Sequence, residues 1–174
     1  LVAQEGHTVK GAMLQGAGDH FCPGGNMYRK GTSLSSLTAV ARASLDLFDG
    51  FCKLHTLPMP VTCAAHGAVL GGGLAACLLI DFVACDKAAT FQVGERSRGI
   101  YPVGLLTRTL AHAVGSKIAT EHYLTEGKLT SEHACETSLV QVVTSSVRSA
   151  QRFASDVVRL YASSIGEDSS AIQE

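Results

Sequence analysis

The chain has 174 residues, which is enough for one domain with a sizeable buried core. Hydrophobic residues make up 46% of the sequence and charged residues only 17%, a balance that excludes a disordered or solvating chain. The formal net charge is −1 and no run of Lys or Arg is present, so we expect no nucleic-acid partner.

The first half of the sequence alternates predicted strands and helices. Residues 8–15 predict a strand that ends in a Gly-rich loop at 16–26. Apolar residues recur at helical spacing between about 34 and 53, which predicts an amphipathic core helix with one buried face. After two prolines, residues 61–65 predict an apolar strand, and 73–80 a buried helix that follows a glycine turn.

The second half predicts short strands at 82–85 and 89–93, and then mostly helix. The helices are expected at roughly 103–114, 116–124 and 130–137, before a strand at 139–143 and a last helix from about 146 to 164. This alternation indicates an α/β domain with largely parallel strands, over residues 1–165. Residues 166–174 predict a polar tail.

Residues 61–80 carry no formal charge, so a hydropathy scan could flag them as a membrane span. They include His66 and four glycines, and a buried strand, turn and helix explain them better, so we expect no membrane span. A small membrane-associated protein is the alternative. The chain opens without a basic region, which predicts no signal peptide, and the lack of an initiating Met leads us to expect a longer polypeptide.

Six cysteines lie mostly in apolar stretches, and none forms a C-x-x-C pair. This spacing predicts buried free thiols in a reducing, intracellular compartment, either the cytoplasm or an organelle matrix. A zinc site or a disulfide framework is the alternative, and we expect no metal site. The cysteines are Cys22, Cys52, Cys63, Cys77, Cys85 and Cys135.

Two glycine-rich turns each follow a predicted strand directly: FCPGGN at 21–26 and HGAVLGGG at 66–73. Glycine lets a ligand approach the main chain, and a helix N-terminus presents unpaired N–H groups with partial positive charge. Side by side, two such turns could aim one N–H each at a single oxygen, as in an oxyanion hole. Taken alone, either glycine-rich segment could instead be a tight turn needed for packing, or a phosphate-binding site. Neither a Walker nor a dinucleotide-binding motif is present.

Several segments, in order, resemble the enoyl-CoA hydratase/isomerase (crotonase) family. FCPGGN resembles its FCAGAD-type loop, and HGAVLGGGLAACLLIDFVAC resembles its GGG-helix-D-strand segment. ATFQVGERSRGIYPVGLLTRTLAHAVG and KIATEHYLTEGKLTSEHACETSLVQVV are similar to the two segments that follow. The resemblance runs from about Gly11 to Thr144. It implies a ββα spiral core with parallel strands followed by helices, and an acyl-CoA or acyl-carrier-protein thioester that becomes an enolate, without a separate cofactor.

By position, the resemblance implies that Gly25 and Gly72 supply the two oxyanion N–H groups. The adjoining substrate-binding positions are Gly24, Gly71 and Gly73. The family's hydratases use two glutamates to hold and activate water, and this chain has Ala75 at the first position and Glu95 at the second. One carboxylate is enough to move a proton between carbons, so isomerase, dehydratase or decarboxylase chemistry is favoured over simple hydration.

Glu95 has three possible roles. It is either a catalytic base, a partner of Arg96 or Arg98 in a solvated turn, or a residue that positions the substrate or another group. An apolar pocket would raise the pKa of Glu95 and the arginines would lower it. Tyr28 and Lys30 follow the first glycine turn, where some crotonase-like domains of polyketide assembly lines contact the substrate; a solvated loop is the alternative.

Three further polar residues are predicted to have structural roles. A hydrogen-bonding role is favoured for His66, Asp81 is expected to brace the corner between helix and strand, and His20 lies either near the pocket or in a loop turn.

The family domain is longer than this chain. We therefore expect the fold to be truncated at both ends, with an opening strand pair before Leu1 and C-terminal helices after Glu174. The resemblance implies a homotrimer or hexamer at full length, in fatty acid or polyketide metabolism. A non-catalytic homologue that binds acyl thioesters or acts as a scaffold is the alternative to an enzyme.

Overall fold

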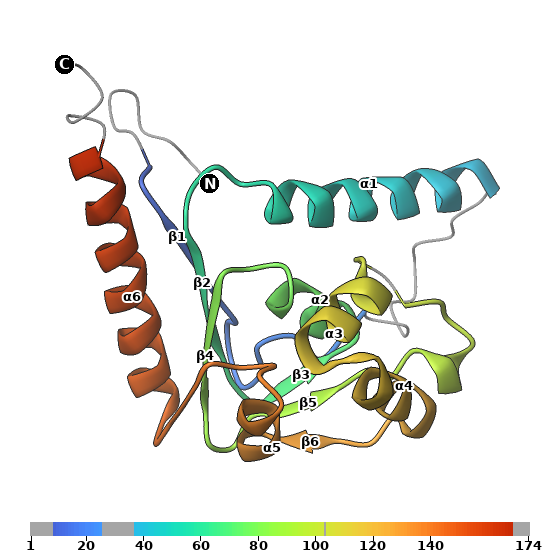
Figure 1. Cartoon of the computed structure of the whole chain (residues 1–174). Helices are drawn as coiled ribbons and strands as arrows, with labels where there is room; N and C mark the ends of the chain where they lie inside the picture. Colours follow the sequence, from blue (N-terminus) through green and yellow to red (C-terminus); the bar gives the residue numbers. More distant parts are fainter. Residues whose placement is uncertain (1–8, 26–36, 103, 169–174) are drawn as a thin grey trace.

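The computed structural model describes residues 9–25, 37–102 and 104–168, which fold into alternating strands and helices around two sheets (Figure 1). In chain order the elements are β1 (Ala12–Gln15), α1 (Leu37–His55), β2 (Val61–Ala65), β3 (Ala68–Leu70), α2 (Gly72–Cys77), β4 (Phe82–Asp86), β5 (Thr90–Gln92), the 3-10 helix η1 (Arg96–Arg98), α3 (Leu106–Val114), α4 (Ser116–Thr125), β6 (Leu129–Thr130), α5 (Ser131–Glu136), β7 (Val142–Thr144) and α6 (Val147–Asp168).

The chain visits the two sheets in turn. The first sheet is parallel throughout, in the order β1-β2-β4-β7, with Leu14 and Val83 on either side of Cys63. The second has the order β3-β5-β6, in which β3 and β5 are parallel and β6 is antiparallel to β5. The chain passes from β2 to β3 and later from β4 to β5, so each pass adds one strand to each sheet. The predicted α/β fold with a spiral of parallel strands is confirmed.

Small side chains hold α6 against one face of the first sheet. Ala64 and Ala84 of the sheet pack against Ala150 and Ala154 of α6, and all four are almost fully buried. The Thr62 hydroxyl donates a hydrogen bond of 2.9 Å to the Ala154 carbonyl. Alternate residues of the same strands point to the opposite face and join the main core with α2 and α3. Among its largest buried side chains are Phe91, Leu74, Leu106 and Leu139.

The predicted elements form close to their expected positions, with two additions that arise from tertiary pairing. The glycine turn at 66–73 contains the short strand β3, because its backbone pairs in parallel with β5; Cys22 adds an isolated bridge on the other side, where the Leu70 N–H donates to the Cys22 carbonyl over 2.9 Å. The two-residue strand β6 forms against β5. Helix α6 continues to Asp168, three residues into the predicted polar tail, and the rest of that tail lies outside the described residues.

The predicted burial of one face of α1 is wrong over most of the helix. Residues 41–50 are all exposed, including Leu45, Leu47 and Phe48 at 68%, 52% and 48%. The helix runs apart from both sheets (Figure 1), and Phe51 near its C-terminal end is half-buried and packs against the main core. An amphipathic sequence predicts the helix, but not which surface lies against its apolar stripe.

Residues 61–80 form β2, β3 and α2, as the strand, turn and helix interpretation predicted. Across the described part of the chain, no helix combines the length and apolarity that a membrane crossing requires. The six cysteines are free, as predicted, but only Cys63, Cys77 and Cys85 are buried; the other three are half-buried. Within the described residues, no group of three or more His, Cys, Asp or Glu side chains is placed to hold a metal ion.

Candidate active site

The two glycine-rich turns lie side by side. The backbone of Cys22 pairs with β3 on both sides, since its N–H donates to the Ala68 carbonyl over 3.2 Å and its carbonyl accepts the Leu70 N–H. Gly73 then approaches the first turn so closely that a Cβ atom there would lie 2.6 Å from both the Cβ and the carbonyl oxygen of Cys22. Glycine at position 73 is therefore a steric requirement for bringing the turns together.

Each turn has an N–H group that finds no hydrogen-bond partner among the described residues. Gly72 is the first residue of α2, whose preceding residue Gly71 has φ 54° and provides no side-chain cap. Among the backbone hydrogen bonds of the described residues, none is donated by the N–H of Gly72 or Gly25. A Cβ atom on Gly25 would meet nothing within 4 Å. Both amides are therefore available to a ligand.

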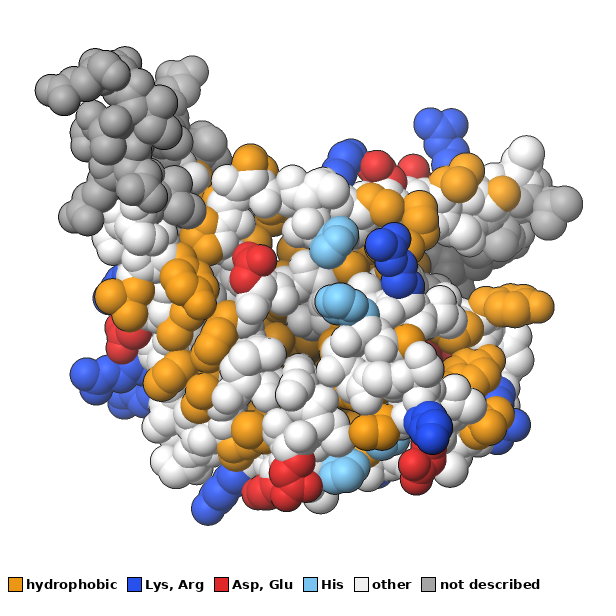
Figure 2. All heavy atoms as spheres, viewed as in Figure 1, with side chains coloured by type: hydrophobic (Ala, Val, Ile, Leu, Met, Phe, Trp, Pro, Cys, Tyr) orange, Lys and Arg blue, Asp and Glu red, His pale blue; other side chains and the backbone are white. Residues whose placement is uncertain are grey.

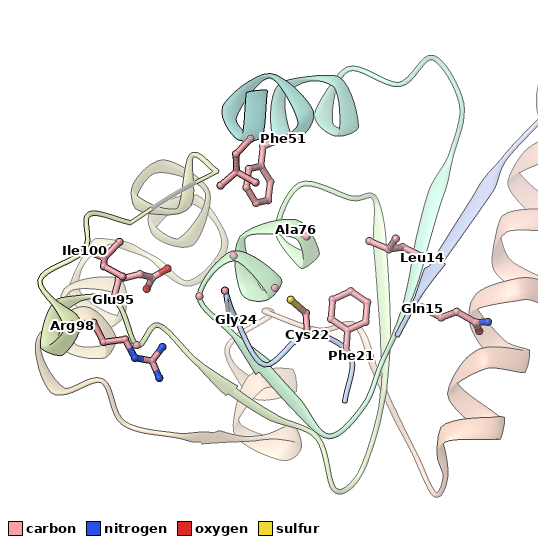
Figure 3. Close-up of a pocket in the computed structure, with 16 residues that line it drawn as sticks. Leu14, Gln15, Phe21, Cys22, Gly24, Phe51, Ala76, Glu95, Arg98 and Ile100 are labelled. Carbon is pink, nitrogen blue, oxygen red and sulfur yellow. The ribbon is translucent and has the colours of Figure 1, made fainter. Parts of the chain in front are cut away.

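A cavity of about 490 Å³ opens where the turns meet (Figure 3). Every predicted site residue that the structure describes lines it, namely Gly24, Gly25, Gly71, Gly72, Gly73 and Glu95. Apolar side chains form much of the remaining wall, among them Leu14, Phe21, Leu47, Phe51 and Ile100. Tyr28 and Lys30 lie outside the described residues.

Glu95 directly precedes η1, and its side chain points toward the glycine turns (Figure 3). The residue is only 6% exposed, and neither carboxylate oxygen accepts a hydrogen bond from another described residue. A Cβ atom on Gly71 would lie 3.0 Å from Oε1 of Glu95, so the carboxylate rests against the backbone of the second turn. Glu95 is the one carboxylate among the described residues that line the cavity.

Burial raises the pKa of Glu95 to about 7, because the cavity wall removes solvent from the charged form. The residue's own backbone amide and the Arg98 guanidinium act in the opposite direction, whereas the charge of Glu126 adds to the rise. The alternative in which Glu95 pairs with Arg96 or Arg98 in a solvated turn is wrong, since Glu95 is buried and none of the ion pairs of the described residues includes it.

Ala75 is fully buried in the main core and does not line the cavity, whereas its neighbour Ala76 does. The cavity wall also includes Arg98 and Phe51, which sequence reasoning did not assign to it. Their positions depend on how η1 and α1 lie against the glycine turns, and no sequence pattern carries that information.

The other polar residues make structural contacts. His66 pairs through Nε2 with the Gly18 carbonyl over 2.9 Å, and His20 Nδ1 accepts the Ala68 N–H over 3.2 Å. Neither histidine lines the cavity. Asp81 braces its corner as predicted: Oδ2 accepts the N–H of Val61 over 2.8 Å, and its own N–H donates to the Val61 carbonyl.

The enoyl-CoA hydratase/isomerase family model matches residues 2–168. A probable enoyl-CoA hydratase of Mycobacterium tuberculosis is 32% identical over 111 residues, which cover 64% of this chain and 43% of that relative. A second probable enoyl-CoA hydratase of the same organism is 31% identical over 140 residues, covering 77% of this chain and 49% of the relative. The chain thus spans less than half the length of these relatives.

Solved structures share the fold. The crystal structure of an enoyl-CoA hydratase from Bacillus anthracis matches with a TM-score of 0.82 and 26% identity, covering 91% of this chain and 61% of that one. An enoyl-CoA hydratase from Polaromonas sp. JS666 matches in fold with a TM-score of 0.80 at 24% identity, over 88% of this chain and 60% of that one. Matched by the family model along nearly all of its residues, the chain belongs to the enoyl-CoA hydratase/isomerase family.

Proposed function

We propose that the cavity binds an acyl thioester, carried by coenzyme A or by a carrier protein, and stabilises its enolate. The thioester oxygen would accept hydrogen bonds from the N–H groups of Gly25 and Gly72. The observation that carries the proposal is the meeting in a single cavity of two amides and one buried carboxylate, none of which has a hydrogen-bond partner in another described residue. As the oxygen gains charge, both hydrogen bonds strengthen, and each donor is expected to lower the barrier by roughly 3–4 kcal/mol.

Glu95 is proposed as the base that removes the proton from the α-carbon. A pKa of about 7 suits this role, because the carboxylate can take a proton near neutral pH and return it to another carbon. Only one carboxylate lines the described cavity, and Ala75 occupies the position where the family's hydratases have another. Isomerase, dehydratase or decarboxylase chemistry is therefore favoured over two-carboxylate water addition.

The assembled protein is proposed to be a homotrimer or hexamer. Support comes from large apolar side chains that stay exposed on the described surface, especially Phe48 of α1 and Leu160 and Tyr161 of α6. Figure 2 shows a band of hydrophobic side chains over α6. Burial of such patches is a common driving force of subunit association. Sedimentation equilibrium would measure the assembly, and a monomer at every concentration would contradict it.

The test of enzymatic function is α-proton exchange in deuterated water, followed by mass spectrometry with saturated, enoyl and β-carboxylated acyl-CoA thioesters. Deuterium gain or a shifted double bond is expected, and Glu95→Gln should abolish it while leaving thioester affinity similar. Loss of CO₂ from the carboxylated members alone would select decarboxylation. Tight binding with neither exchange nor product would overturn the enzymatic proposal and favour a non-catalytic acyl-thioester-binding homologue.

A further inference from the structure

Glu126 adopts a backbone conformation that side chains disfavour. It ends α4 with φ 49° and ψ 29°, in the left-handed region, and its N–H donates to the His122 carbonyl over 3.0 Å. Leu105 and Ser138 are the other described non-glycine residues with positive φ. A Cβ atom makes this region unfavourable, and residues are held there by their surroundings, often near functional sites. The contacts of Glu126 explain what holds it.

Two hydrogen bonds connect Glu126 to both ends of the segment that carries Glu95. The side-chain amide of Gln92 donates to the Glu126 carbonyl over 2.7 Å. The N–H of Ser97 donates to Glu126 Oε2 over 3.0 Å. Gln92 precedes Glu95 by three residues and Ser97 follows it by two, so the residue that follows α4 restrains the chain on both sides of the buried carboxylate.

The restraint extends to the glycine turns. The Gln92 carbonyl accepts the N–H of Gly71 over 3.0 Å, and Gly71 is the residue against which the Glu95 carboxylate rests. The left-handed turn at Glu126 lets its carbonyl face Gln92 while its carboxylate reaches η1. A glycine there would keep the first contact and lose the second.

We propose that Glu126 is a positioning residue for Glu95: it clamps the segment between Gln92 and Ser97, and so fixes the carboxylate opposite the two glycine amides. The inference rests on the proposed function of Glu95 as the base. It adds a residue that does not line the cavity.

The clamp also has an electrostatic consequence. The hydroxyl and backbone N–H of Ser97 hold the pKa of Glu126 below its usual range, and Arg96 contributes in the same direction, so Glu126 stays ionised when Glu95 titrates. Its charge raises the pKa of Glu95, against the guanidinium of Arg98 on η1. Removing the charge should therefore lower the pKa of Glu95.

The test compares Glu126→Gln and Glu126→Gly with Ser138→Gly. Gln keeps the size and a hydrogen-bond acceptor but removes the charge, whereas Gly relaxes the backbone and removes the carboxylate. Ser138 has φ 63° and does not line the cavity, so its replacement controls for relaxation of a left-handed residue alone. The readouts are the pH profile of α-proton exchange with a short saturated acyl-CoA, and the carboxyl band of Glu95 in infrared titration, assigned by Glu95→Gln.

Both Glu126 variants should move the exchange midpoint and the Glu95 titration to lower pH. Glu126→Gly should also reduce kcat by on the order of tenfold, with little change in KM, because a misplaced base loses reactivity without losing substrate contacts. Ser138→Gly should change neither. The proposal is overturned if the Glu95 titration stays unmoved in both Glu126 variants, or if Ser138→Gly moves it equally.

The infrared titration requires no turnover. If the parent protein neither exchanges a proton nor forms product from any of the thioesters, the proposed function fails, and the band of Glu95 still decides whether Glu126 controls it. Circular dichroism and thermal unfolding of each variant establish that it folds. If Glu126→Gly does not fold, Glu126→Gln gives the deciding result.

Discussion

Gly73 and Cys22 belong to different glycine-rich turns, and a Cβ atom on Gly73 would lie 2.6 Å from the Cβ atom of Cys22. The second turn enters α2 at this point, and the first carries Gly25 three residues after Cys22. This contact sets how closely the two free amides approach one another. The geometry of the proposed oxyanion hole therefore depends on one missing methyl group.

Gly73→Ala should separate the turns and destabilise the protein by about 1–3 kcal/mol, the usual cost of inserting a methyl group into a packed site. Urea unfolding followed by circular dichroism measures the change. Gly50→Ala is the matched control, because Gly50 lies exposed on α1 and a Cβ there meets nothing within 4 Å. It should stabilise the helix by roughly 0.5–1 kcal/mol. Equal effects of the two substitutions would contradict the steric argument.

Glu95→Gln should remove proton exchange and yet stabilise the protein above neutral pH. The pKa of Glu95 is raised from 4.5 to about 7, so the folded state binds a proton that the unfolded state has already lost. Stability is therefore expected to fall as pH rises from about 4.5 to 7 and then to level off, with a loss of roughly 2 kcal/mol because the open cavity weakens the full effect.

Urea unfolding of the parent and of Glu95→Gln, between pH 4 and pH 8, checks this linkage. The free energy of unfolding of Glu95→Gln should not show this fall with pH. Asp81→Asn is the control, because it removes a carboxylate that lies outside the cavity. A parent protein whose stability increases through this window would show that the carboxylate of Glu95 is stabilised in its charged form.

Phe51→Ala should weaken binding of thioesters with long acyl chains more than that of short ones. Phe51 lines the cavity, and its ring also packs against Gly104, where a Cβ atom would meet the ring at 2.8 Å. The loss of apolar contact predicts a KM increase of on the order of tenfold for long acyl chains. Steady-state kinetics over a chain-length series would measure it. Phe48→Ala is the control, since Phe48 lies on the exposed part of α1 and outside this cavity. If Phe51→Ala raised KM equally for every chain length, Phe51 would not contact the acyl chain.

Thiol reagents should distinguish two classes of cysteine in the native protein. Burial raises the pKa of Cys85 to about 12, and hydrogen bonding to Cys63 together with burial raises the pKa of Cys77 well above its usual range. A thiol that stays protonated in a closed core is a poor nucleophile. Cys22, Cys52 and Cys135 are half-buried and should react first with a disulfide reagent, as peptide mapping would show. Early labelling of Cys85 would contradict the packing of β4.

Local patterns predicted most of the fold. The apolar run at 61–65 became the buried strand β2, and helical spacing located α1, α3, α4 and α6, because these elements are specified by propensity and periodicity within a short stretch of chain. The same holds for the two glycine turns and for Glu95, whose place in a family pattern was visible without coordinates. Sequence reasoning also identified Ala75 at the position where the family's hydratases have their first glutamate.

Tertiary structure decided the remainder, since it depends on which surfaces meet. Strand β3 exists because it pairs with β5, a segment about twenty residues further along the chain, and α1 contacts the body at Phe51 while residues 41–50 stay exposed. From the sequence, burial could raise the pKa of Glu95 and a neighbouring arginine could lower it. In the structure the effect of burial is the larger, so the pKa is raised. The clamp at Glu126 joins residues about thirty positions apart in the chain. The sequence does not give the distance in space between such residues, and hydrogen bonds and desolvation depend directly on that distance.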